Sequence, residues 1–149
     1  AMSFQEKRSI VSLLCNIVIA LGYFLYLFQR VEDGGAAVRD DLRFWAAAIL
    51  ILIPVYVVFH IVFQVIFLVI YVAATGEKDL DLTDEFDRMV ELKSTRNFYH
   101  MFMAGFLFSL GAVVAEQPAY VMFLGVLAGV VAASIVQDLS QFFYYRRGV

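Results

Sequence analysis

Four apolar runs dominate this sequence and restrict what it can fold into. They cover residues 9–28, 44–74, 98–116 and 119–137. An α-helix rises about 1.5 Å per residue, so about 20 mainly apolar residues are needed to cross a hydrocarbon core about 30 Å thick. The sequence therefore predicts an all-α integral membrane four-helix bundle.

Composition agrees with a membrane protein and excludes several classes of function. Of the 149 residues, 62% are hydrophobic, whereas soluble domains are about 45–50% apolar. Four spans use most of the chain, so we expect a single transmembrane domain over residues 1–149 without an extramembrane catalytic domain. The net charge of −3 argues against a function in nucleic-acid binding, because nucleic acids are bound by basic surfaces. The single cysteine, Cys15, is expected to be a small buried hydrophobe.

Lysine and arginine are divided unequally between the two sides of the predicted membrane domain. One side carries Lys7, Arg8, Lys78, Arg88, Lys93, Arg96, Arg146 and Arg147, and the other carries Arg30, Arg39 and Arg43. Short loops rich in these residues stay in the cytoplasm. We therefore predict that both termini are cytoplasmic. The second run is longer than a bilayer requires, so it must tilt, kink near Pro54 or extend into the cytoplasm, which we expect.

The three predicted connections differ in character. The outer connection, 30–43, contains Gly34-Gly35 and several acidic residues, which predicts a solvated loop. The short connection around Pro118 makes the third and fourth spans antiparallel neighbours. The inner connection, 75–97, is charged. Gly76 is a candidate helix C-cap, and Asp81 or Thr83 a candidate N-cap.

A charged helix is predicted to lead from the inner connection directly into the third span. It covers residues 84–97, which contain no helix breaker, and we expect it to extend into the cytoplasm. Its charged residues form the candidate interaction surface: Asp84, Glu85, Asp87, Arg88, Glu91, Lys93 and Arg96. Together with Glu77, Asp79 and Asp81, the acidic members could bind a divalent cation, but they lack the spacing of an EF-hand, so a solvated acidic turn is favoured.

Polar side chains inside membrane spans are costly and are candidate functional residues. The candidate cluster consists of Asn16, His60, Gln64 and His100, near the inner boundary. Three interpretations remain open. The two histidines could ligate haem or a metal ion; an ion or proton path could use His60, His100, Asp138 and Glu116; or these residues could only form interhelical hydrogen bonds, which we favour.

Small residues recur every four positions in the last two spans. They are Gly125, Gly129 and Ala133 in the fourth span and Gly105 and Ser109 in the third. Such spacing permits close approach of two helices. The partner helix could belong to the same chain or to a second copy.

No catalytic motif is recognisable in the sequence. A glycine-rich phosphate loop, a nucleophile elbow, an HExxH pattern and a Cys/His pair are all missing. We therefore expect no enzyme activity, no catalytic residue, no metal site and no cofactor.

The segment TDEFDRMVELKSTR, from Thr83 to Arg96, resembles a family of small prokaryotic four-span membrane proteins of unknown function. The mark of that family is a D-E-x-D/E-x-x-I-x-x-K/R-like stretch leading into a span. Outside this segment only the layout of the spans is similar. The resemblance implies a bacterial or archaeal inner membrane and carries no activity or catalytic residue. The family typically has arginine where this chain has Phe86.

Taken together, the sequence predicts a non-enzymatic inner-membrane component of unknown specific role. We expect it to form a homo-oligomer, or to bind a membrane or cytoplasmic protein, through its charged helix. The first alternative is a small transporter or channel component that uses the polar cluster. The second is a haem-binding or metal-binding membrane protein.

Overall fold

The computed structural model of the chain describes residues 4–76 and 85–148, and these residues are helical apart from short connections. The helices are α1 (Phe4–Arg39), α2 (Leu42–Thr75), α3 (Glu85–Val114) and α4 (Ala119–Arg147). All four are long and apolar enough to cross a membrane. This confirms the prediction of an all-helical chain with four helices of spanning length, and it indicates a multi-pass membrane protein.

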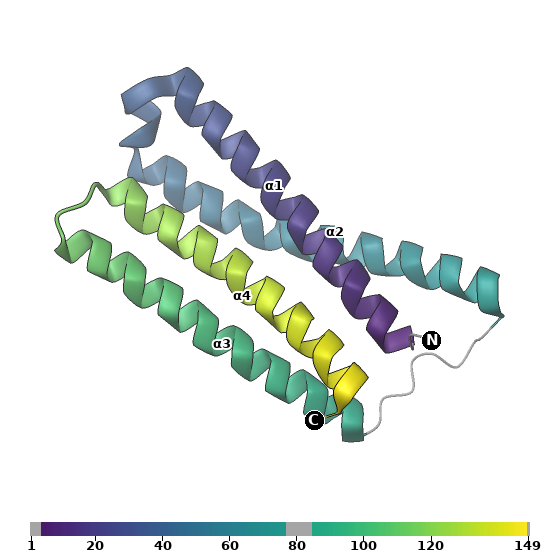
Figure 1. Cartoon of the computed structure of the whole chain (residues 1–149). Coiled ribbons are helices and arrows are strands. Elements are labelled where there is room, and N and C mark those ends of the chain that lie inside the picture. The colour runs from purple at the N-terminus through teal and green to yellow at the C-terminus, as the bar shows by residue number, and fades with distance from the viewer. Residues whose placement is uncertain (1–3, 77–84, 149) are drawn as a thin grey trace.

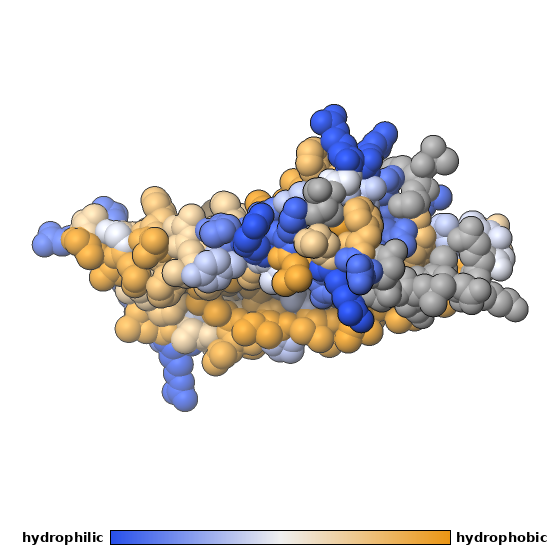
Figure 2. Space-filling view, turned by 90° about the horizontal axis from the view of Figure 1, so that it is seen from below, coloured by the Kyte–Doolittle hydropathy of each residue, from blue (hydrophilic) through white to orange (hydrophobic). Residues whose placement is uncertain are grey.

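The four helices run alternately up and down the long axis of the molecule (Figure 1). The first and last described residues lie at one end. The α1–α2 and α3–α4 connections lie at the opposite end. In the space-filling view, hydrophilic residues gather toward the end where α3 begins and α4 ends, and much of the surface beyond it is hydrophobic (Figure 2). A broad apolar surface between polar ends is what a bilayer requires.

α4 occupies the centre of the arrangement. It packs against α1, α2 and α3, and α1 also packs against α2. Among the described residues, α3 contacts α4 and neither of the other two helices. The helices therefore form an open bundle in which α1, α2 and α4 share a core and α3 is attached to its side.

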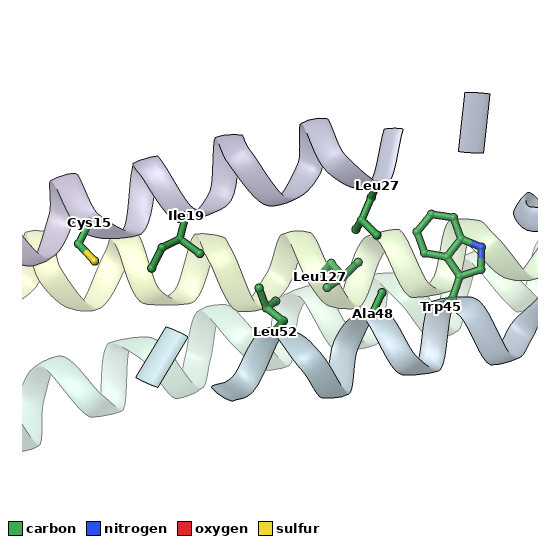
Figure 3. Close-up of a cluster of buried hydrophobic side chains, with 7 residues drawn as sticks. All are labelled: Cys15, Ile19, Leu27, Trp45, Ala48, Leu52 and Leu127. Carbon is green, nitrogen blue, oxygen red and sulfur yellow. The ribbon is translucent and has the colours of Figure 1, made fainter. Parts of the chain in front are cut away.

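The core lies between α1, α2 and α4 and contains no residue of α3 (Figure 3). Its buried members are Cys15, Ile19 and Leu27 of α1, Trp45, Ala48 and Leu52 of α2, and Leu127 of α4. The cysteine is thus a buried hydrophobe, as predicted. Trp45 contributes to this core, where its ring stacks on that of Tyr120 with centroids 6.5 Å apart.

The outer connection is shorter than predicted. α1 continues to Arg39, and α2 already begins at Leu42, after Asp41 has capped it by accepting a hydrogen bond from the Arg43 N–H (3.0 Å). Helical structure can continue because residues 30–39 contain no proline and include the helix-forming pair Ala36-Ala37. Gly35, at φ 62° and ψ −147°, interrupts the helix in a conformation that is essentially open only to glycine. The expected loop over 30–43 is therefore wrong: most of it is helix with one sharp change of direction.

The helix ends that flank the connection 75–97 largely follow the prediction. α2 continues through Pro54 and ends at Gly76, whose left-handed backbone (φ 73°) places its N–H 2.8 Å from the Val72 carbonyl oxygen. α3 runs without interruption from Glu85 into the third apolar run, as expected. Asp84, the N-cap candidates Asp81 and Thr83, and the acidic residues Glu77 and Asp79 lie outside the described residues. α4 continues to Arg147, ten residues beyond the predicted end of the fourth span.

α3 and α4 meet backbone to backbone through their small residues. A Cβ atom added to Gly105 would lie 2.8 Å from the Gly129 Cα, and one added to Gly125 would collide with the Ser109 hydroxyl. Ala133, one turn further along α4, is fully buried. The structure thus places the partner of the small-residue stripe within the same chain.

Candidate functional site

A buried carboxylate forms the centre of the candidate site. Asp138 of α4 is 6% exposed. The Ser12 hydroxyl donates a hydrogen bond to its Oδ1 (2.8 Å), and the Asn16 side-chain amide donates one to its Oδ2. Ser12 and Asn16 are four residues apart on α1, so both face the same side of that helix. One carboxyl group thereby ties α4 to two successive turns of α1.

The hydrogen-bonded chain continues from α1 to α2. The Asn16 Oδ1 lies 3.0 Å from the Nε2 of His60. Because an amide oxygen can only accept, the histidine nitrogen is the donor in this arrangement. Four side chains, Ser12, Asp138, Asn16 and His60, thus connect all three helices that share the core.

One further side chain borders this chain. The ring of Tyr56 stacks on the imidazole of His60, one turn further along α2, with ring centroids 5.8 Å apart. The Tyr56 hydroxyl is buried and makes no hydrogen bond to any described residue. The site therefore includes, next to His60, a buried hydroxyl group that has no hydrogen-bond partner among the described residues.

The site lies well inside the helices. Asp138 precedes Arg146 by eight residues, and Asn16 follows Arg8 by eight residues. At about 1.5 Å per residue, both side chains stand about 12 Å from the basic residues at that end of the molecule. Asp138 and Asn16 therefore share one level within two neighbouring helices.

The hydrogen-bond polarity of this chain can reverse. In the observed arrangement, His60 donates to Asn16, which donates to Asp138. If Asp138 carries a proton, a half-turn of the Asn16 amide lets its oxygen accept from the carboxyl group and its NH₂ donate to a His60 nitrogen. The Ser12 hydroxyl can donate or accept. The site can therefore hydrogen-bond both the charged and the neutral form of Asp138.

The four residues of the predicted polar cluster are only partly brought together. Asn16 and His60 are in direct contact. Gln64, one turn beyond His60, is half-buried, and no side-chain hydrogen bond joins it to the other residues of the cluster in the described ranges. His100 is exposed on α3, where its imidazole meets the ring of Tyr99 edge-on. Since the described part of α3 contacts neither α1 nor α2, a bis-histidine ligand set of His60 and His100 is not assembled.

Ser12 is the site residue that sequence reasoning does not single out, and Asp138 is considered there only as a member of a possible ion or proton path. Asp138 directly follows the fourth apolar run, and the structure shows that α4 continues for nine residues beyond it. Ser12 gives only a weak signal, namely its spacing of four residues from Asn16. In residues 4–76 and 85–148, no three side chains of His, Cys, Asp or Glu are grouped closely enough to hold a metal ion.

The charged segment of α3 is docked on the end of α4. Val90 and Ser94 are buried, and the Asn97 amide donates to the Ser140 hydroxyl (2.9 Å) and the Tyr144 hydroxyl (3.1 Å). Among its charged residues, Glu85, Arg88, Glu91 and Arg96 are exposed, and Asp87 and Lys93 are half-buried. The candidate interaction surface is therefore the side of α3 that faces away from α4.

Comparison with known proteins gives no relative from which a role could be transferred: no protein family, no curated protein and no solved structure matches the chain.

Proposed function

We propose that this chain is a small, non-enzymatic protein of a prokaryotic cytoplasmic membrane that binds and releases a proton at Asp138 as part of solute or ion transport. The observation that carries the proposal is a buried carboxyl group, hydrogen-bonded to Ser12 and Asn16, inside helices of membrane-spanning character. Ionisable residues in such positions commonly belong to proton relays and ion pathways.

The charge of Asp138 has no basic counterpart nearby. Within the described parts of the chain, no lysine, arginine or histidine lies within ion-pair distance of its carboxyl group, and the histidine of the site contacts Asn16 instead. An isolated carboxylate in an apolar interior costs several kcal/mol or more. A proton removes this cost, and the hydrogen-bonding groups around Asp138 accommodate both forms.

The proposed orientation follows the distribution of basic residues. The end of the molecule that holds the described termini carries Lys7, Arg8, Arg88, Lys93, Arg96, Arg146 and Arg147, and the opposite end carries Arg30, Arg39 and Arg43. By the positive-inside tendency, both termini are cytoplasmic. The first turns of α3 and the last turns of α2 then extend beyond the membrane on that side, and Asp138 is reached from the cytoplasm.

An infrared titration tests whether Asp138 takes up a proton. The protein is reconstituted in lipid nanodiscs, and the carbonyl band of protonated carboxyl groups is followed as the pH is lowered. We expect one component of this band to be absent from Asp138→Asn and retained in Asp33→Asn, whose aspartate is exposed. Identical bands in wild type and Asp138→Asn would refute proton binding. A band that responds to added Na⁺ and not to pH would indicate that Asp138 binds a metal cation instead of a proton.

The coupling to transport is tested in vesicles that enclose a pH-sensitive dye. Outward gradients of Na⁺ and of K⁺ are imposed in turn, and the internal pH is recorded. We expect proton movement with wild type and Asp33→Asn and none with Asp138→Asn. Equal traces for vesicles with and without protein would contradict the transport part of the proposal.

A second candidate function is partner binding through the charged segment of α3. The observation that favours it is an exposed apolar stripe at three-residue spacing, Phe86, Met89 and Leu92, among charged residues. If this segment stands in the cytoplasm, a partner protein or another copy would cover it. The small-residue stripe gives no support to a homo-oligomer, because α3 occupies it. Crosslinking followed by mass measurement in mild detergent tests this function, and a strictly monomeric particle without a co-purifying protein would oppose it.

A further inference from the structure

An apolar groove of about 440 Å³ lies at the outer end of the molecule. It borders a part of α1 that lies beyond the residues in contact with Asp138. It is formed by the outer half of α1 and the first turns of α2 and α4. Its lining includes Phe24, Phe28, Trp45, Tyr120 and Leu124, with Arg39 as the one charged member. The volume falls within the roughly 300–1,000 Å³ of small-molecule sites.

Arg39 is held in place at this groove. The helix break at Gly35 turns the last residues of α1 over the end of the bundle (Figure 1). The Trp45 indole N–H donates to the Arg39 carbonyl oxygen (2.8 Å), and the Arg39 guanidinium lies over the Tyr120 ring, 5.5 Å from its centroid. Trp45 therefore holds the backbone of Arg39, and the Arg39 guanidinium stands over an aromatic ring beside the apolar groove.

A carboxylate accompanies this cation. The Asp40 Oδ1 lies 3.6 Å from the Arg39 Nε, and both side chains are substantially exposed. A guanidinium next to a carboxylate is complementary to a headgroup that carries a phosphate and an ammonium group, because arginine binds phosphate well and a carboxylate accepts from an ammonium.

We propose that the groove binds one acyl chain of phosphatidylethanolamine, with the lipid phosphate on Arg39 and its primary ammonium group on Asp40. An anionic lipid fits less well, because the outer end carries more acidic than basic residues: Glu32, Asp33, Asp40, Asp41 and Glu116 against Arg30, Arg39 and Arg43. The inference requires that the helices cross a bilayer and is independent of proton binding at Asp138.

The only tryptophan of the chain lines the groove, which gives a direct readout. The protein is reconstituted in phosphatidylcholine vesicles that contain a fixed small fraction of a lipid with brominated acyl chains, which quench tryptophan fluorescence on contact. Trp45 is 2% exposed and faces the core (Figure 3), so lipid that merely surrounds the protein reaches it poorly. We expect brominated phosphatidylethanolamine to quench several-fold more than brominated phosphatidylcholine or phosphatidylglycerol.

Two arginine variants test the phosphate contact. Arg39→Gln should lower the apparent affinity for brominated phosphatidylethanolamine about five- to tenfold, the effect of losing about one charge-assisted hydrogen bond. Arg30→Gln is the matched control, because Arg30 also lies over an aromatic ring, that of Tyr26, and does not line the groove. Equal loss in both variants would overturn the assignment of Arg39.

The headgroup and the chain are tested separately. Asp40→Asn should abolish the preference for phosphatidylethanolamine over phosphatidylcholine, whose quaternary ammonium donates no hydrogen bond. Leu124→Phe should fill the groove and reduce quenching by both, whereas Leu107→Phe, at an exposed position of α3, should not. Equal quenching by all three brominated lipids in wild type, or stronger quenching by phosphatidylglycerol, would refute the proposal.

Discussion

The two faces of α4 hold their neighbours by different means. Toward α3, Gly125 and Gly129 bring two backbones together, and the packing depends on the absence of side chains. Toward α1, Asp138 is joined by hydrogen bonds to Ser12 and Asn16. At these glycines the first contact depends on shape, and the hydrogen bonds of Asn97 to Ser140 and Tyr144 near the end of α4 join uncharged groups. The second depends on the protonation state of one carboxyl group, so it can respond to a chemical change while the first stays fixed.

This difference suggests a division of roles between the two halves of the molecule. A contact between glycines has no alternative arrangement, because any displacement opens a gap that nothing fills. The hydrogen-bonded chain through Asn16 has two polarities. Movement associated with function is therefore expected between α4 and the α1–α2 pair. In such a movement, α3 and α4 would move together as one rigid unit.

The largest expected effect is at the shape-dependent contact. Gly105→Leu places a branched side chain against the Gly129 backbone, which cannot yield, and should lower the free energy of unfolding by about 3 kcal/mol or more. Gly111→Leu, on the same helix with open space around it, should change it by less than about 1 kcal/mol. Unfolding in mixed micelles with increasing SDS measures both. Equal destabilisation would show that α3 and α4 do not meet at their glycines.

The next effect concerns the carboxyl group of the polar contact. Asp138→Ala leaves two buried donors, from Ser12 and Asn16, without their acceptor and should cost about 2 kcal/mol. Asp138→Asn keeps an acceptor of similar shape and should cost about half as much. The same SDS unfolding experiment applies. A destabilisation as large in Asp138→Asn as in Asp138→Ala would mean that the carboxylate charge itself stabilises the fold.

A smaller effect is expected for the link to α2. A double-mutant cycle with Asn16→Ala and His60→Ala should give a coupling energy of about 1 kcal/mol, near the upper part of the range for hydrogen bonds between membrane helices. A parallel cycle with Asn16→Ala and His100→Ala should give none, since His100 lies on α3. Coupling to His100 of the same size would contradict the placement of the two histidines.

The smallest effect compares one serine on each face. Ser12→Ala removes a hydrogen bond to Asp138 and should cost about 0.6 kcal/mol. Ser109→Ala removes only a bond to the Gly105 carbonyl oxygen of its own helix (2.8 Å) and should be close to neutral. Thermal unfolding in detergent measures the difference in stability between the two variants. The reverse order would mean that hydroxyl groups matter more at the α3–α4 contact than at the site.

The features that the sequence predicts well are those that depend on a few neighbouring residues. The four helices follow from apolar runs, and the end of α2 follows from Gly76, a residue suited to the left-handed conformation of a C-cap. The small residues of α3 and α4 likewise predict close packing. The identity of the helix that packs against these small residues depends on tertiary structure. The structure shows that α3 and α4 pack against each other.

The polar site was harder to predict because it is assembled from three helices. Asn16 and His60 were singled out as polar residues within apolar runs. Asp138 is named only as a member of a possible ion or proton path, because it directly follows the fourth apolar run and the sequence does not show that it faces Ser12 and Asn16; α4 continues for nine residues beyond it. The sequence also suggests His100, because its depth along its helix is close to that of His60. Depth along a helix does not fix the direction in which a side chain points or the helix beside it.

The attachment of α3 to α4 alone, among the described residues, bears on the order in which the protein is assembled. The two helices are joined by a short turn, and contacts between segments so close in the sequence form early. α3 and α4 can therefore enter the membrane as a preformed hairpin after α1 and α2 have been inserted. The residues of the polar site come from α1, α2 and α4, so the site can form only once α4 has joined the first two helices.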